Sequence, residues 1–170
     1  FAAVGKYNEF ENLRVAGVRY ADLRGFSYDR ADVTSRGLAN AYAQTLGTVF
    51  TEAQKPYEVE IIVAEVGVDE AHDQLYRLTF DGSVGDEHGF LAMGGAAEAI
   101  STQLQEQWQP DLSLSDALQM AVAALAEHGG QGPRTLDDKQ LEVAILDRTR
   151  PRRAFRRVIG EELKRLLNTE

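Results

Sequence analysis

Apolar positions along the chain predict a mixture of helices and strands. The apolar residues 1–5 predict a buried strand, already under way from an upstream segment. Helical spacing predicts one helix over residues 8–24, capped by Asn8 with Glu11 and closed by Gly25. It predicts a second helix from Asp29 or Asp32 that ends before Pro56. Residues 57–66 then read as a strand covered on both faces, and residues 74–80 as an alternating strand.

The second half continues this pattern in a definite order. Residues 90–93 predict a short strand, and two helices follow over 97–108 and 114–125, the second capped by Ser113 with Asp116. Two strands over 141–146 and 153–158 precede a short helix over 160–167. Paired helices between runs of strands argue against a doubly wound parallel sheet. The order predicts a single α+β domain, a layered sandwich with helix pairs outside and two mainly antiparallel sheets inside.

Composition and charge narrow the function classes. The 170 residues are 44% hydrophobic, which supports a globular core. They contain no cysteine, which excludes disulfides and thiolate metal sites. No apolar run reaches the roughly 18 residues of a membrane helix. Residues 1–147 carry 24 acids and 10 bases, which argues against nucleic-acid binding. We interpret the basic residues within 148–157 as a solvated or subunit-facing edge; contact with RNA or anionic lipid is the alternative.

The sequence shows no complete catalytic site. His72, His88 and His128 lack metal-ligand spacing, and the acids around Asp86 do not follow a calcium-loop pattern. No nucleophile elbow is present, and no Ser or Thr has a recognisable His/Asp partner. We therefore expect no catalytic residue, no metal and no cofactor.

Six segments in a fixed order carry a family resemblance. They are AAVGKYNEFENLR from residue 2, KPY at 55 leading into VEIIVAEVG, LYRLTFDGSVG from 75, FLAMGGAAEAI from 90, LSLSDALQMAVAAL from 112 and LEVAILDR from 141. Together they resemble the α-type subunits of the 20S proteasome core particle, most closely the actinobacterial kind. The resemblance implies the four-layer αββα sandwich of amino-terminal-nucleophile hydrolases, here without the family's gating tail, first helix and first strands. Glu58 also departs from the family, which usually has Gly there.

The resemblance implies a structural and gating function rather than catalysis. Seven α subunits would form a ring that stacks on a ring of catalytic β subunits, whose amino-terminal Thr is the nucleophile. Phe1 cannot take that role. The implied tasks are to form the gated entrance, dock a regulatory ATPase ring and template the β ring. Substrates would be unfolded proteins or proteins tagged with a prokaryotic ubiquitin-like protein, in the cytoplasm, with no nucleic acid and no membrane as partner.

Individual residues follow from the same resemblance. The turn over residues 50–55 matches the segment that narrows the axial entrance: Phe50, Thr51, Glu52, Ala53, Gln54 and Lys55. Tyr7 and Asn8 match the edge of the pocket that receives the activator's carboxy-terminal residues, and the helix over residues 8–24 matches the one that packs on the β ring. From charge alone, we expect Arg152 and Arg153 to meet acidic groups on a neighbouring subunit.

Two other interpretations stay open. One is a catalytic β-type threonine peptidase subunit of the same fold, which needs a mature amino-terminal Thr. The other is an unrelated α+β module that binds peptides or acidic ligands through its basic carboxy-terminal end.

Overall fold

The computed structural model describes residues 1–130, 132–150 and 152–167. The chain groups into two compact units, Phe1–His88 and Gly89–Glu170, and each is described by itself. The single domain expected from the sequence stays a prediction. Within the described ranges, no helix is long and apolar enough to cross a membrane.

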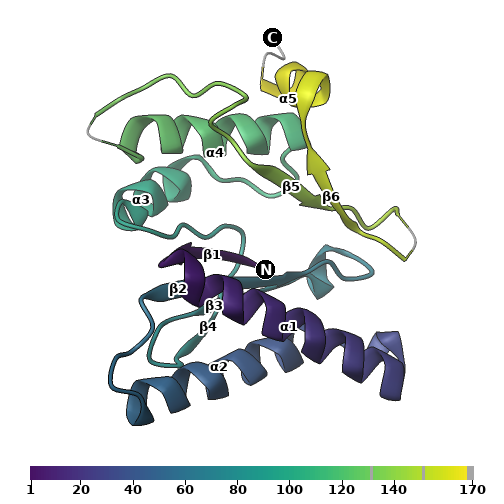
Figure 1. Cartoon of the computed structure of the whole chain (residues 1–170). Coiled ribbons are helices and arrows are strands. Elements are labelled where there is room, and N and C mark those ends of the chain that lie inside the picture. The colour runs from purple at the N-terminus through teal and green to yellow at the C-terminus, as the bar shows by residue number, and fades with distance from the viewer. Residues whose placement is uncertain (131, 151, 168–170) are drawn as a thin grey trace. The chain divides into compact units, whose positions relative to one another are not determined.

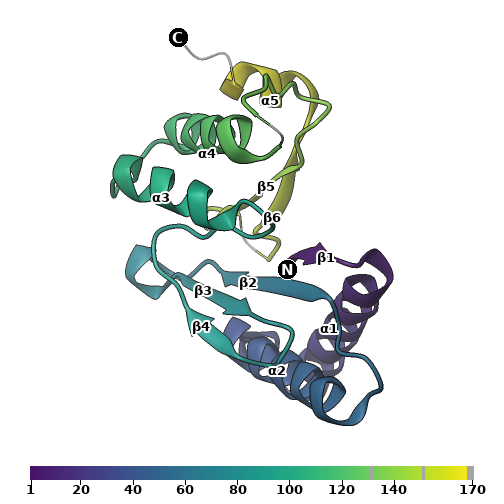
Figure 2. The same ribbon diagram turned by 90° about the vertical axis from the view of Figure 1, so that its left-hand side faces the viewer.

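The first unit is a four-stranded antiparallel sheet with two helices on one face (Figures 1 and 2). Its strands lie in the order β1-β2-β3-β4, and the register places Ala3, Ile61, Leu78 and Val84 in one row across the sheet. Its elements are β1 (Ala2–Gly5), α1 (Tyr7–Ser27), α2 (Ser35–Glu52), β2 (Val59–Glu65), β3 (Gln74–Leu78) and β4 (Val84–Asp86), with short 3-10 turns at Arg30–Asp32 and Glu70–His72.

The core of this unit joins the helices to the sheet. Leu46, Ile61 and Leu78 are completely buried, and each such side chain contributes about 1.5–3 kcal/mol of hydrophobic stabilisation. Tyr42 packs against α1 at Gly17, where a Cβ would lie 1.7 Å from the Tyr42 hydroxyl. Burial raises the pKa of Tyr42 to about 12. The glycine therefore lets α1 and α2 approach closely.

In its described residues, the second unit contains three helices and a two-stranded antiparallel sheet. Ile100, Leu104 and Ala124 form its core together with Ala92. The hydroxyl of Ser115 donates a hydrogen bond to the carbonyl of Leu166 at 3.1 Å, which ties the last helix to its neighbour. The elements are α3 (Ala97–Gln107), α4 (Leu114–His128), β5 (Val143–Leu146), β6 (Phe155–Val158) and α5 (Gly160–Leu167).

The observed order of elements is the predicted one, and the helices with antiparallel sheets confirm the α+β class. The strand predicted over residues 90–93 is wrong, because these residues pair with no strand in the described part of the chain. They lie between Gly89 and Gly94, whose φ angles are +79° and +100°. The third strand of the block is β4 instead. Phe90 and Ala92 pack as core residues against the helices of the second unit.

The predicted start and end of the first helix are also wrong. α1 begins at Tyr7, its N-cap residue is Lys6, and Asn8 lies inside the first turn rather than capping it. Glu11 forms an ion pair with Arg14 at 2.7 Å instead of closing a capping box. Gly25 does not end the helix, which continues to Ser27.

The second helix and two strands need smaller corrections. Asp29 caps the 3-10 turn at Arg30–Asp32, and α2 itself begins at Ser35 with Thr34 as its N-cap. β1 is an edge strand of the described sheet and is only half-buried, not buried. β2 buries alternate residues and leaves Ala64 exposed, so it is not covered on both faces.

Candidate functional site

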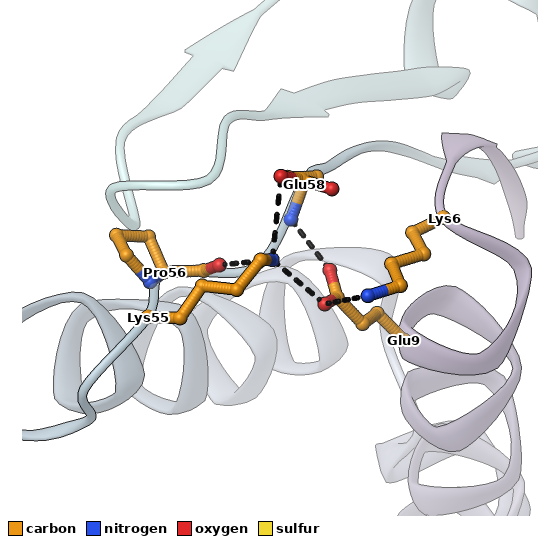
Figure 3. Close-up of polar contacts among 5 residues, drawn as sticks. All are labelled: Lys6, Glu9, Lys55, Pro56 and Glu58. Atoms are coloured by element: carbon orange, nitrogen blue, oxygen red, sulfur yellow. Dashed lines mark hydrogen bonds and ion pairs between the residues drawn. The ribbon is translucent and has the colours of Figure 1, made fainter.

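A buried carboxylate joins the two segments of the first unit that the sequence singled out. Glu9, in the first turn of α1, is only 7% exposed. Its Oε1 lies 3.0 Å from the Lys55 ammonium and 3.8 Å from the Lys6 ammonium (Figure 3). Its Oε2 accepts a hydrogen bond from the backbone N–H of Glu58 at 2.6 Å. One side chain thus connects the start of α1 to the segment that links α2 with β2.

Lys55 has further acceptors around its ammonium group. Its Nζ donates to the carbonyl of Pro56 at 2.9 Å and lies 3.5 Å from the Glu58 carboxylate (Figure 3). An ammonium carries three N–H donors, and here three oxygens of different groups surround it. The Lys55 side chain is therefore held in place even though about half of it is exposed.

The local backbone explains why these groups meet. Gly5 has a φ of +115°, and a Cβ there would lie 2.0 Å from the carbonyl oxygen of Glu58. This close approach lets the N–H of Lys6 donate to the same carbonyl at 2.9 Å. The chain then passes directly from β1 into α1. Glycine is required because only a residue without Cβ accepts both the left-handed backbone and the contact.

The electrostatic surroundings keep Glu9 and Lys55 ionised. Burial alone raises the pKa of Glu9, but the N–H of Glu58 and the ammonium of Lys55 outweigh it, so this pKa lies below its ordinary value. The hydrogen bond with Glu9 raises the pKa of Lys55 above its ordinary value. Both partners therefore stay charged around neutral pH.

The predicted pocket-edge residues are neighbours of this cluster in the sequence. Tyr7 and Asn8 lie in the first turn of α1, between Lys6 and Glu9. Tyr7 is 70% exposed, and its ring meets Phe10 edge-on at 5.3 Å. Asn8 is exposed and makes no cap, so its side chain is available at the surface.

The predicted axial segment is half helix rather than a turn. Phe50, Thr51 and Glu52 form the end of α2, and Ala53 is its C-cap. The remaining residues, Gln54 and Lys55, lead to Pro56.

Both ends of this segment have neighbours. The ring of Phe50 lies 5.8 Å from the ring of Phe80, which follows β3. Lys55, at the other end, binds Glu9. The structure thus brings the axial segment and the first turn of α1 together.

Sequence reasoning missed the part played by Glu9. It treated this acid only as a charge in the positive first turn of a helix. No local pattern reveals that a residue 46 positions away supplies its partner.

The predicted subunit contacts lie in the second unit, after β5. Arg152 and Arg153 are exposed, and within the described part of the chain neither has a hydrogen-bond or ion-pair partner. Arg152 has a φ of +69°, which is uncommon for a residue with a side chain. By contrast, Arg156 lies 2.8 Å from Glu162 and Arg157 lies 3.5 Å from Glu142. Two of the basic residues are therefore already paired inside the chain.

The histidines form no metal site in the described residues, where no group of three or more His, Asp or Glu side chains is placed to hold a metal ion. His72 and Asp69 form an exposed surface pair, with Nδ1 of His72 2.6 Å from the Asp69 carboxylate.

Comparison with known proteins decides the family. The profile of the family described as "Proteasome subunit" matches residues 1–146. The chain belongs to the proteasome subunit family. Its helices and antiparallel sheets agree with the α+β, amino-terminal-nucleophile-hydrolase type of fold that the sequence predicted.

Several curated relatives are actinobacterial proteins named "Proteasome subunit alpha". The chain is 66% identical to the one from Kineococcus radiotolerans, over 98% of this chain and 73% of the relative. It is 66% identical to the one from Sanguibacter keddieii, over 98% of this chain and 66% of the relative. It is 59% identical to the one from Streptomyces griseus, over 100% of this chain and 64% of the relative. The proteasome subunit described here thus spans about two thirds to three quarters of these relatives.

Proposed function

We propose that the chain is a non-catalytic α-ring subunit of a 20S proteasome core particle. Its relatives are named as α subunits, and the family match covers residues 1–146. In this proposal, seven copies form a ring with head-to-tail contacts, and the ring stacks on catalytic β subunits. Peptide-bond hydrolysis takes place in the β subunits. Co-purification of a tagged β subunit with this chain tests the assignment.

The observation that carries this proposal is that α1 exposes apolar side chains on the side opposite its buried face. Leu13 and Gly17 are buried on the side that meets the core. At 100° per residue, Val15 and Phe26 point the opposite way, and Val18 lies beside them. Their exposures are 36%, 90% and 48% respectively. Exposed apolar side chains gathered on one side of a helix are typical of a surface that another protein covers, so the outer face of α1 favours docking on another subunit.

The same proposal assigns a gate to the axial segment and a docking edge to the start of α1. The α ring closes the chamber, receives a regulatory ATPase ring at Tyr7 and Asn8, and templates the β ring. Its substrates are unfolded proteins and proteins that carry a prokaryotic ubiquitin-like tag, degraded in the cytoplasm with ATP consumed by the ATPase ring. Nucleic acids and membranes have no part in it.

A bulky side chain at Thr51 is expected to slow peptide uptake. Thr51 is exposed at the end of α2, and its hydroxyl donates to the Gly47 carbonyl at 3.0 Å. In assembled particles, Thr51→Trp narrows the axial opening and reduces hydrolysis of an internally quenched peptide several-fold.

Thr45 offers a matched control for this measurement. It is exposed on the same helix, and its hydroxyl donates to the Ala41 carbonyl at 3.1 Å. Thr45→Trp should leave uptake unchanged. Equal hydrolysis by the Thr51→Trp and wild-type particles would count against the entrance role of the segment.

Charge reversal at Arg152 and Arg153 is expected to weaken ring assembly. The absence of internal partners among the described residues supports a role for both guanidinium groups outside the subunit. An exposed ion pair contributes up to about 1 kcal/mol, and a closed ring repeats each contact at every interface. The variant Arg152→Glu/Arg153→Glu should assemble at higher protein concentration and with altered salt dependence, measured by analytical ultracentrifugation. Lys139→Glu, at another exposed position, is the control; identical behaviour of both variants contradicts the assignment.

A further inference from the structure

The Glu9 carboxylate connects segments that are far apart in the sequence and close in the first unit. Its partners Lys55 and Glu58 lie 46 and 49 residues away. Both carboxylate oxygens are engaged, one by an ammonium and one by a backbone N–H. Burial removes a carboxylate from water, and its hydrogen bonds and ion pairs offset that cost in free energy. If either partner is lost, the cost remains and the offset is smaller. The contact therefore fixes the geometry between the two segments.

We infer that Glu9 is a positioning residue that couples the first turn of α1 to the axial segment Phe50–Lys55. Tyr7 and Asn8 share that turn with Glu9, so a displacement of the turn moves the carboxylate and, through it, Lys55. This inference rests on the proposed function of both segments, and it adds the side chain that links them.

The other end of the axial segment is held separately. Phe50 contacts Phe80 through their rings, and the hydroxyl of Thr51 returns to the carbonyl of Gly47 in α2. Between these contacts and Lys55 lie only Glu52, Ala53 and Gln54, which are exposed. The segment thus has one anchor on the sheet side and one anchor on α1. Only the second responds directly to movement of the first turn of α1.

Glu58 strengthens the anchor on Lys55. Its N–H binds Glu9, its carbonyl accepts from the N–H of Lys6, and its carboxylate lies 3.5 Å from Lys55. The residue that departs from the family pattern therefore supplies both a backbone and a side-chain contact in this cluster. Its backbone has a negative φ, so no glycine is required there.

The variant Glu9→Gln tests the coupling, with Glu11→Gln as its matched control. Both acids lie in the first two turns of α1, and both form an ion pair, but among the described residues Glu11 pairs only with Arg14 on the same helix. In assembled α–β particles, hydrogen–deuterium exchange is measured over residues 53–58. We expect exchange there to rise about tenfold in Glu9→Gln, as for loss of one charge-assisted hydrogen bond, and to stay unchanged in Glu11→Gln. Unchanged exchange in Glu9→Gln would overturn the inference.

A second readout separates coupling from simple loss of structure. A synthetic peptide with the carboxy-terminal residues of the organism's regulatory ATPase is added to the particles. Binding is followed by fluorescence anisotropy, and uptake by hydrolysis of a quenched peptide. We expect Glu9→Gln to keep the peptide affinity within about twofold and to lose most of the stimulated uptake. Equal stimulation in the Glu9→Gln and wild-type particles would also overturn the inference.

Two further variants keep the test decisive if Glu9→Gln does not assemble. Lys55→Gln removes the same contact from its half-exposed end, and we expect it to lose stimulation in the same way. Lys55→Arg retains the positive charge, and we expect it to keep most of the stimulated peptide uptake. Loss of stimulation in Lys55→Arg equal to that in Lys55→Gln contradicts the coupling. Failure of the proposed function is read separately, from wild-type particles that neither bind the peptide nor respond to it.

Discussion

Gly5→Ala is expected to lower the free energy of unfolding of the native subunit by about 2–5 kcal/mol, since overpacking costs about 1–3 kcal/mol and a left-handed backbone about 1–2 kcal/mol. The new Cβ would lie 2.0 Å from the carbonyl oxygen of Glu58, and φ at this position is +115°. The obstructing atom is backbone, so no side-chain rotation relieves the contact. Urea denaturation followed by circular dichroism measures the loss.

Gly95→Ala is the matched control for this substitution. Gly95 lacks a left-handed φ, and an added Cβ meets no atom within 4 Å. Its denaturation midpoint should stay close to that of the wild type. If Gly5→Ala and Gly95→Ala unfold at the same urea concentration, β1 does not approach residue 58 this closely. The geometry described around Glu9 would then be contradicted as well.

Phe26→Glu is expected to abolish co-assembly with the β subunit while leaving the subunit folded. The ring is 90% exposed, so its replacement removes little internal packing. An aromatic side chain at the centre of an interface contributes about 2–4 kcal/mol, and a carboxylate there adds the cost of a buried charge. Native mass spectrometry of the co-expressed subunits reports the loss of the particle.

Val68→Glu gives the corresponding control. Val68 is 85% exposed in the loop between β2 and β3, away from α1 in the sequence. This variant should assemble like the wild type. Normal assembly of Phe26→Glu would show that the outer face of α1 is not a docking surface.

Local signals in the sequence were sufficient for most elements. Ser113 accepts from the N–H of Asp116, as the capping pattern predicted, and the last helix, Gly160–Leu167, has the predicted bounds. The order of strands and helices also follows from the spacing of apolar residues. These features depend on neighbours within one or two turns, which a single sequence displays.

The errors arise where distant contacts override local preference. Asn8 and Glu11 form a plausible cap by spacing, but the turn at Gly5 starts the helix earlier, at Tyr7. Residues 90–93 have strand-like composition, but they pack against helices of the second unit instead of pairing with a strand in the described residues. Propensity alone cannot supply such information.

At the candidate site, too, the sequence displayed the local features and did not display the distant contact. The resemblance located Tyr7, Asn8 and the segment that ends at Lys55, and their roles stay proposals. It did not indicate that a buried carboxylate joins them, because neither burial nor a partner 46 residues away is visible in a local pattern. The resemblance also indicated that the helix over residues 8–24 packs on the β ring, but it did not single out the exposed Val15 and Val18, which lie on an otherwise polar side of α1.

Electron microscopy of the native subunit co-expressed with its β partner, combined with a peptide-hydrolysis assay of each component alone, tests the central claim most directly. We expect stacked rings in which this chain forms the outer layer, and hydrolysis only when β is present. Purified chain that cleaves peptides unaided, or that stays monomeric in the presence of β, would contradict it.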